Sequence, residues 1–135
     1  MIVVDTNLVA YLLIPGEHTD SARGALARDP EWAAPLLLRS ELRNVLALYL
    51  RQGHLDLDDA IAVQHAGEAM VAGREYAIDS SVVLGLVAGS GLSAYDCEFV
   101  ALARALDRPL VTADKRLRKA FPETTVPLAE FAASP

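Results

Sequence analysis

The chain has 135 residues, the usual size of one domain and enough to bury a hydrophobic core without disulfide bonds. Its single cysteine, Cys97, excludes an intramolecular disulfide and a thiolate metal cage, so any metal must be bound mainly by oxygen. The net charge of −6 counts against a simple nucleic-acid binder, which normally presents a basic face to phosphates. Charges interrupt every apolar run before the ~20 residues of a membrane span, and no signal peptide is recognisable, so we expect one soluble, cytoplasmic domain over residues 1–135.

The predicted elements alternate along the chain between short strands and amphipathic helices. Apolar or β-branched runs predict strands at residues 2–4, 32–34, 75–78, 109–112 and around Val126. Helical spacing and capping residues predict helices at residues 8–12, 19–28, 36–51, 56–72, 80–88, 94–106 and 115–121. This alternation favours an α/β fold with a mostly parallel sheet that is covered by helices on both faces.

Four carboxylates stand out because each is attached to an apolar surface. Asp5 and Asp114 follow predicted strands, whereas Glu41 and Asp96 share helix faces with apolar residues at i+4 and i+7. Ligands of open α/β sheets bind at the carboxyl ends of strands, so we expect Asp5 and Asp114 to meet. Carboxylates on apolar faces with no obvious basic partner suggest a shared cation. Mg²⁺ prefers oxygen ligands and promotes phosphodiester hydrolysis by an activated water.

Each carboxylate also has a simpler structural explanation. Asp5 and Asp114 could be helix N-caps, and Asp96 could cap the helix that begins near Ser93. Glu41 could form an ion pair with Arg39, with Arg43 or with another surface arginine.

The remaining chemically reactive side chains are interpreted as structural. Cys97 has no histidine in the same motif and is expected to be a small buried apolar residue rather than a nucleophile. Tyr11, Trp32 and Tyr95 are assigned to the core. The histidines lack a regular metal-binding spacing and are expected to be surface or packing residues: His18, His54 and His65.

The order and spacing of four short motifs resemble the PIN domain. These motifs are Asp5-Thr6-Asn7, Ser40-Glu41-Leu42, Leu92-Ser93-Ala94-Tyr95-Asp96 and Leu110-Val111-Thr112-Ala113-Asp114. More specifically, the chain is similar over nearly its full length to the VapC-like ribonuclease toxins of type II toxin–antitoxin systems. The resemblance implies a three-layer α/β sandwich with a mostly parallel central sheet.

The resemblance also implies a Mg²⁺-dependent endoribonuclease, with Mn²⁺ as an alternative metal. The implied metal ligands and catalytic residues are Asp5, Glu41, Asp96 and Asp114, with Asp5 and Asp96 in direct contact with the metal. Asn7 and Thr112 match supporting polar positions, although many relatives have Ser where this chain has Asn7. The implied partners are RNA, a second copy of the chain in a homodimer, and a small antitoxin that joins it in a larger assembly.

Two other functions compete with the ribonuclease. A haloacid-dehalogenase-like phosphohydrolase would use Asp5 as a nucleophile, but that class expects a second Asp where Asn7 stands. A non-catalytic PIN-like binding module would not need intact acidic positions. The dense basic run either guides RNA phosphates to the site or is a solvated helix face: Lys115, Arg116, Arg118 and Lys119.

Overall fold

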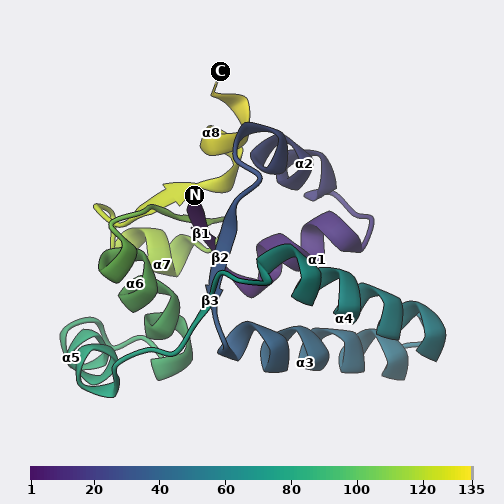
Figure 1. Ribbon diagram of the computed structural model, residues 1–135, viewed down its shortest axis with the longest axis horizontal. Coiled ribbons are helices and arrows are strands. Elements are labelled where there is room, and N and C mark those ends of the chain that lie inside the picture. The colour runs from purple at the N-terminus through teal and green to yellow at the C-terminus, as the bar shows by residue number, and fades with distance from the viewer. Residues whose placement is uncertain (135) are drawn as a thin grey trace.

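The computed structural model describes residues 1–134 and has a central five-stranded sheet (Figure 1). Every strand pair is parallel, and the strand order is β3-β2-β1-β4-β5. The strands are β1 (Ile2–Val4), β2 (Trp32–Pro35), β3 (Glu75–Tyr76), β4 (Leu110–Thr112) and β5 (Thr125–Pro127). The central strand β1 is therefore flanked by β2 and β4, and the carboxyl ends of these strands open at one edge of the sheet.

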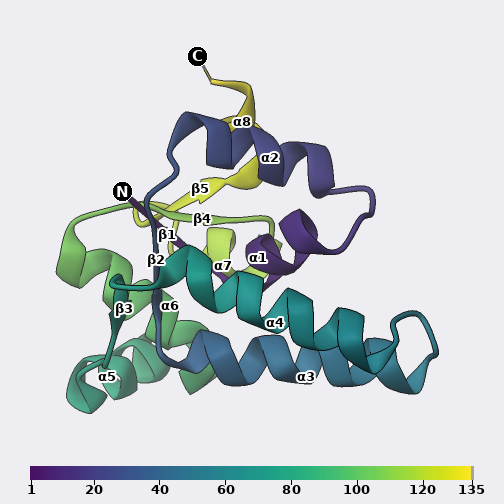
Figure 2. The same cartoon turned by 45° about the vertical axis from the view of Figure 1, so that its right-hand side comes forward.

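Helices cover both faces of the sheet, which gives the predicted three-layer α/β sandwich. The helices are α1 (Thr6–Leu13), α2 (Thr19–Arg28), α3 (Leu37–Arg51), α4 (Leu57–Val71), α5 (Ser80–Ser90), α6 (Ala94–Leu106), α7 (Lys115–Ala120) and α8 (Leu128–Ala133). Figures 1 and 2 place α5, α6 and α7 on one side of the sheet and α1, α3 and α4 on the other. Helix α8 packs against α2 beside the end of β5.

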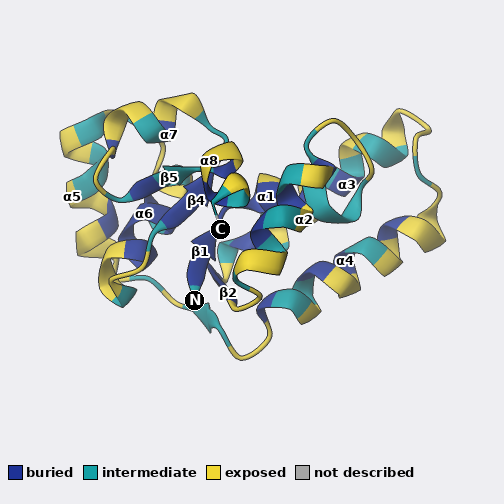
Figure 3. Ribbon diagram, turned by 90° about the horizontal axis from the view of Figure 1, so that it is seen from above, coloured by how far each residue is buried: buried dark blue, intermediate teal, exposed yellow. Residues whose placement is uncertain are grey.

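The strands are short apolar runs because both faces of the sheet are buried. Figure 3 shows the central strands as buried, while the outer faces of the helices are exposed. Helix α4 approaches α3 and α1 so closely that Gly67 is needed. A Cβ at Gly67 would lie 2.5 Å from Leu42 Cδ2 and 3.2 Å from Val9 Cγ1.

The predicted strands and helices are confirmed, with boundaries that agree to within about two residues. Helix α8 was not predicted, because it is short and begins at Pro127 without a side-chain cap. Helix α5 begins at Ser80 and is capped by Asp79, whose carboxylate accepts a hydrogen bond from Ser81 N at 2.8 Å. No single helix within residues 1–134 is long and apolar enough to cross a membrane. Helices α5 and α6, which meet at an angle of 114°, would be long and apolar enough only if they are taken together.

The expected core assignments hold for two of the three aromatic residues. Trp32 is fully buried, and Tyr11 is partly buried against the core. Tyr95 was wrongly assigned to the core. Its side chain is 62% exposed, because the first turn of α6 directs it toward a pocket rather than toward the sheet.

Candidate active site

A pocket of about 510 Å³ lies at the carboxyl ends of β1 and β4, and all four predicted carboxylates line it. Asp5 directly follows β1, and Asp114 stands two residues after β4. Glu41 comes from the second turn of α3, and Asp96 comes from the first turn of α6. Four segments that are distant in sequence therefore bring their carboxylates to one pocket, as expected from the parallel topology.

Asp5 is the most deeply buried of the four, with 8% of its surface exposed. Its Oδ1 accepts a hydrogen bond from Leu8 N at 3.0 Å, and its Oδ2 accepts one from Thr112 Oγ1 at 2.5 Å. Burial raises the pKa of Asp5 to about 6, while these two hydrogen bonds oppose the rise. The charges of Asp114 and Glu41 add smaller contributions that raise the pKa further.

Thr112 joins two of the carboxylate-bearing segments. Its hydroxyl donates to Asp5 and accepts a hydrogen bond from Asp114 N at 3.0 Å, so one side chain connects the ends of β1 and β4. Thr112 is completely buried at the last position of β4. Thr112, for which the motif predicted a supporting role, therefore contacts two of the acidic segments.

Glu41 is held by a neutral donor and not by an arginine. Thr6, the first residue of α1, donates from Oγ1 to Glu41 Oε1 at 2.7 Å. Partial burial raises the pKa of Glu41, the Thr6 hydrogen bond opposes this, and the charge of Asp96 contributes to the rise.

One of the two arginines that lie two residues from Glu41 is engaged elsewhere. Arg39 forms a bidentate ion pair with Glu75, with both N–O distances at 2.7 Å, and a longer contact with Glu68 at 3.1 Å. The alternative in which Arg39 neutralises Glu41 is therefore wrong. Arg43, the other arginine considered as its partner, forms no ion pair within residues 1–134.

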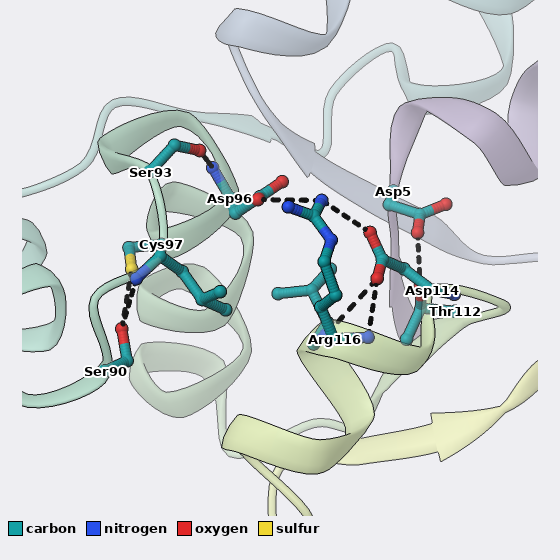
Figure 4. Close-up of polar contacts among 10 residues, drawn as sticks. Asp5, Ser90, Ser93, Asp96, Cys97, Thr112, Asp114 and Arg116 are labelled. Carbon is teal, nitrogen blue, oxygen red and sulfur yellow. Dashed lines mark hydrogen bonds and ion pairs between the residues drawn. The ribbon is translucent and has the colours of Figure 1, made fainter.

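Asp96 and Asp114 share one cationic side chain (Figure 4). Arg116 Nη2 lies 3.1 Å from Asp114 Oδ2 and 3.5 Å from Asp96 Oδ2. Partial burial tends to raise the pKa of Asp114, but hydrogen bonds from Arg116 and Leu117 and the charge of Arg116 lower it below its ordinary value. The pocket thus contains two ion-paired carboxylates, Asp96 and Asp114, and two carboxylates with neutral donors only, Asp5 and Glu41.

The helix-cap explanation is correct for two of the carboxylates and does not exclude a role in the pocket. Asp5 caps α1, and Asp114 caps α7 by accepting from Arg116 N at 2.8 Å and Leu117 N at 3.4 Å. Helix α6 is capped by Ser93, whose hydroxyl accepts from Asp96 N at 3.0 Å. The Asp96 side chain is therefore not the cap of its own helix.

The other predicted residues divide between the pocket and the surface. Asn7 is exposed and lines the pocket, but its side chain forms no hydrogen bond within the described residues. In the basic run only Arg116 lines the pocket, while Lys115, Arg118 and Lys119 do not. Cys97 is fully buried and contacts Ser90 Oγ at 3.8 Å, which confirms it as a small core residue.

Sequence reasoning missed several residues of this region. Asn44, three positions after Glu41 on the same face of α3, lines the pocket, and helical spacing alone could have identified it. Glu98 was not singled out, yet burial and the charge of Glu41 raise the pKa of its carboxyl. The bridging role of Arg116 has no signal in the sequence beyond its proximity to Asp114.

The donor set fits a hard divalent cation, although it is not arranged as a closed metal cage. No group of three His, Cys, Asp or Glu side chains within residues 1–134 has the arrangement of a metal-binding cluster. All acidic groups of the pocket are oxygen donors, and Mg²⁺ commonly uses one or two carboxylates while it keeps several waters. Such a cation would be held by a few of these carboxylates, and water would complete its coordination.

Comparison with known proteins identifies the family. The model of the PIN domain matches residues 2–121. Ribonuclease VapC3 from Pyrobaculum aerophilum is 30% identical over 129 residues, which cover 93% of this chain and 98% of that protein.

Solved structures show the same fold at lower sequence identity. PAE2754 from Pyrobaculum aerophilum has a TM-score of 0.75 at 22% identity, covering 98% of this chain and 97% of its own. FitAcB from Neisseria gonorrhoeae has a TM-score of 0.71 at 18% identity, covering 93% and 96%. A toxin–antitoxin complex from Klebsiella pneumoniae has a TM-score of 0.64 at 19% identity, covering 93% and 96%. The chain belongs to the PIN domain family and, within it, to the VapC-like proteins.

Proposed function

We propose that this protein is a Mg²⁺-dependent endoribonuclease and the toxin of a type II toxin–antitoxin system. The observation that carries the proposal is the convergence of Asp5, Glu41, Asp96 and Asp114 on one pocket at the carboxyl edge of a PIN-type sheet. The ribonuclease named VapC3, which this chain resembles over nearly its whole length, supports the assignment of RNA as the substrate.

A divalent cation bound here would neutralise the scissile phosphate and lower the pKa of the attacking water. The chain's own residues would hold and orient that cation. Asp5 and Asp96 face the pocket from β1 and α6 and are assigned as direct ligands, and Asp114 and Glu41 complete the acidic set. Mn²⁺ has the same preference for oxygen ligands and should replace Mg²⁺.

The supporting residues would keep the carboxylates ionised and oriented. Thr112 donates to Asp5, and Thr6 donates to Glu41, so each carboxylate keeps oxygen lone pairs free to face the pocket. The hydroxyl groups lower the pKa of their acidic partners, which counteracts burial. A preorganised negative site of this kind attracts a divalent cation and thereby reverses the field that an RNA phosphate meets.

The membership in the PIN family argues against the dehalogenase-like alternative. That class needs a second Asp two residues after the nucleophile, and Asn7 stands at this position. The non-catalytic binding module is disfavoured by the four acidic side chains that line the pocket, since such a module would have no need of them.

The test is cleavage of a mixed-sequence RNA by the purified protein in Mg²⁺ and in EDTA. We expect cleavage in Mg²⁺ alone, and we expect Asp5→Asn and Asp96→Asn to lower the rate by about 100-fold or more. Asp58→Asn, which changes an exposed residue of α4, is the matched control. Full activity of both site variants, or activity in EDTA, would contradict the proposal.

Exposed apolar side chains offer surfaces for the proposed protein partners. Within residues 1–134 they lie on α3 and α4 and on α5 and α6, and comprise Leu36, Leu48, Leu57, Ile61, Val82, Leu84 and Tyr95. We propose that a second copy of the chain and an antitoxin cover part of this surface, a proposal supported by the similarity to the toxin–antitoxin complex from Klebsiella pneumoniae. Co-expression with a short reading frame next to its gene should give a complex without RNase activity, and a protein that remains monomeric and active would contradict this.

A further inference from the structure

Arg116 is the only cationic side chain within residues 1–134 that forms an ion pair in the acidic pocket. Its Nη2 lies 3.1 Å from Asp114 Oδ2 and 3.5 Å from Asp96 Oδ2, so it lies between two carboxylates from different segments (Figure 4). Its backbone N also donates to Asp114 Oδ1 at 2.8 Å. The backbone of α7 thus stays attached to Asp114 while the guanidinium reaches across to α6.

The guanidinium of Arg116 places a positive charge beside the carboxylates of Asp96 and Asp114. Asp96 and Asp114 are mutually repulsive when both are ionised, and a positive charge between them offsets that repulsion. Asp5 and Glu41 have only neutral hydrogen-bond donors. A divalent cation that binds Asp96 together with Asp114 must therefore compete with the chain's own arginine.

We propose that Arg116 is a built-in competitor of the divalent cation: it holds Asp96 and Asp114 together in the metal-free protein and must leave them when the metal binds. This inference rests on the proposed metal-dependent function. The side chain of Arg116 is 68% exposed, so its head group can swing toward solvent without movement of α7. The competition therefore raises the concentration of metal that is needed to fill the site, but it does not block the site.

The first measurement is calorimetric titration of Mn²⁺ into metal-free protein at low ionic strength, without RNA. Arg116→Ala should bind Mn²⁺ about two- to fivefold more tightly than the unmodified protein, because exposed ion pairs contribute this order of affinity. Arg118→Ala is the matched control, since it removes the same charge from the same helix at a residue that does not line the pocket. We expect its Mn²⁺ affinity to change by less than that of Arg116→Ala.

The second measurement reports displacement of the side chain directly. The Nε–H signal of Arg116, assigned by its loss in Arg116→Lys, should shift during Mg²⁺ titration with the midpoint that calorimetric titration of Mg²⁺ gives. A signal that does not move at saturating Mg²⁺, or a Mn²⁺ affinity in Arg116→Ala that is equal to or lower than that of the unmodified protein, overturns the inference. Failure of the unmodified protein to bind Mn²⁺ would instead overturn both the inference and the proposed function.

Discussion

Thr112 and Asp5 lie 107 positions apart in sequence, yet the hydroxyl of Thr112 donates to the carboxylate of Asp5 at 2.5 Å in the buried floor of the pocket. The contact depends on the parallel pairing of β1 with β4, which places Val4 beside Val111 and so brings the two strand ends together. Because Thr112 also accepts from Asp114 N, it couples the orientations of two acidic residues. We therefore propose that Thr112 supports the site by fixing the orientation of these two residues.

Thr112→Val should weaken both the fold and the activity. It removes a hydrogen bond to a buried carboxylate and leaves Asp114 N without its acceptor, so we expect a loss of about 1–3 kcal/mol in the free energy of unfolding. The Thr112 hydroxyl lowers the pKa of Asp5, so its removal should move the acidic limb of the pH–rate profile to higher pH. Thr112→Ser, which keeps the hydroxyl, should restore the pH–rate profile of the unmodified protein. Equal pH–rate profiles for Thr112→Val and the unmodified protein would show that the hydrogen bond to Asp5 is merely structural.

Asp5 should make the metal-free protein less stable as the pH rises through about 6. The pKa of Asp5 is raised from 3.8 to about 6 in the folded state, so this state binds the proton more tightly than the unfolded chain. The protonated carboxyl therefore contributes stability that is full below pH ~4 and is lost as the pH approaches and passes about 6. In EDTA at pH 7, Asp5→Asn should thus be more stable than the unmodified protein, by about 1–3 kcal/mol.

Urea unfolding at pH 4 and pH 7 measures this difference in stability. Saturating Mn²⁺ should make the unmodified protein the more stable of the two, because it gains more free energy from metal binding than Asp5→Asn does. Asp58→Asn serves again as the exposed control. The pKa values of Asp29 and Glu75 are lowered, so these residues give the free energy of unfolding the opposite pH dependence. They do so equally in Asp5→Asn and in the unmodified protein, and their contributions cancel in the difference. An Asp5→Asn protein that is no more stable at pH 7 would contradict the burial argument.

Charge reversal on the exposed part of α7 should weaken the binding of RNA. Lys115 and Lys119 lie outside the pocket on the helix that carries Arg116, so Lys115→Glu with Lys119→Glu removes attraction without touching the acidic residues. We expect a several-fold rise in KM for RNA, little change in kcat, and a flatter dependence of kcat/KM on salt. Unchanged KM and salt dependence would show that the run is only a solvated face.

The fold and the identity of the acidic residues could be predicted because their signals are local. β-branched runs that end at Asp5 and near Asp114, and helical spacing around Glu41 and Asp96, are visible in one sequence. The parallel topology then requires strand ends to meet at one edge. Helix α8 was not predicted because six residues behind a proline carry almost no periodic signal.

The partners of the carboxylates could not be predicted, because they depend on side-chain geometry across distant segments. Nothing local pairs Thr6 with Glu41, and the guanidinium of Arg116 reaches Asp96 only because α6 and α7 flank the same pocket. The choice of Glu75 as the partner of Arg39 likewise follows from the packing of α3 beside β3. Sequence reasoning identified the acidic groups, but the structure was needed to tell which are neutralised.

The most direct test of the account is the chemical nature of the ends that the protein leaves on a defined RNA in Mg²⁺. Attack by water predicts products without a 2′,3′-cyclic phosphate at any time point, and one atom of ¹⁸O in the new terminal phosphate when the reaction runs in labelled water. The Asp96→Asn variant should not form this labelled end. A 2′,3′-cyclic phosphate, which forms when the ribose hydroxyl is the nucleophile, or cleavage that persists in EDTA, would contradict metal-dependent hydrolysis at this pocket.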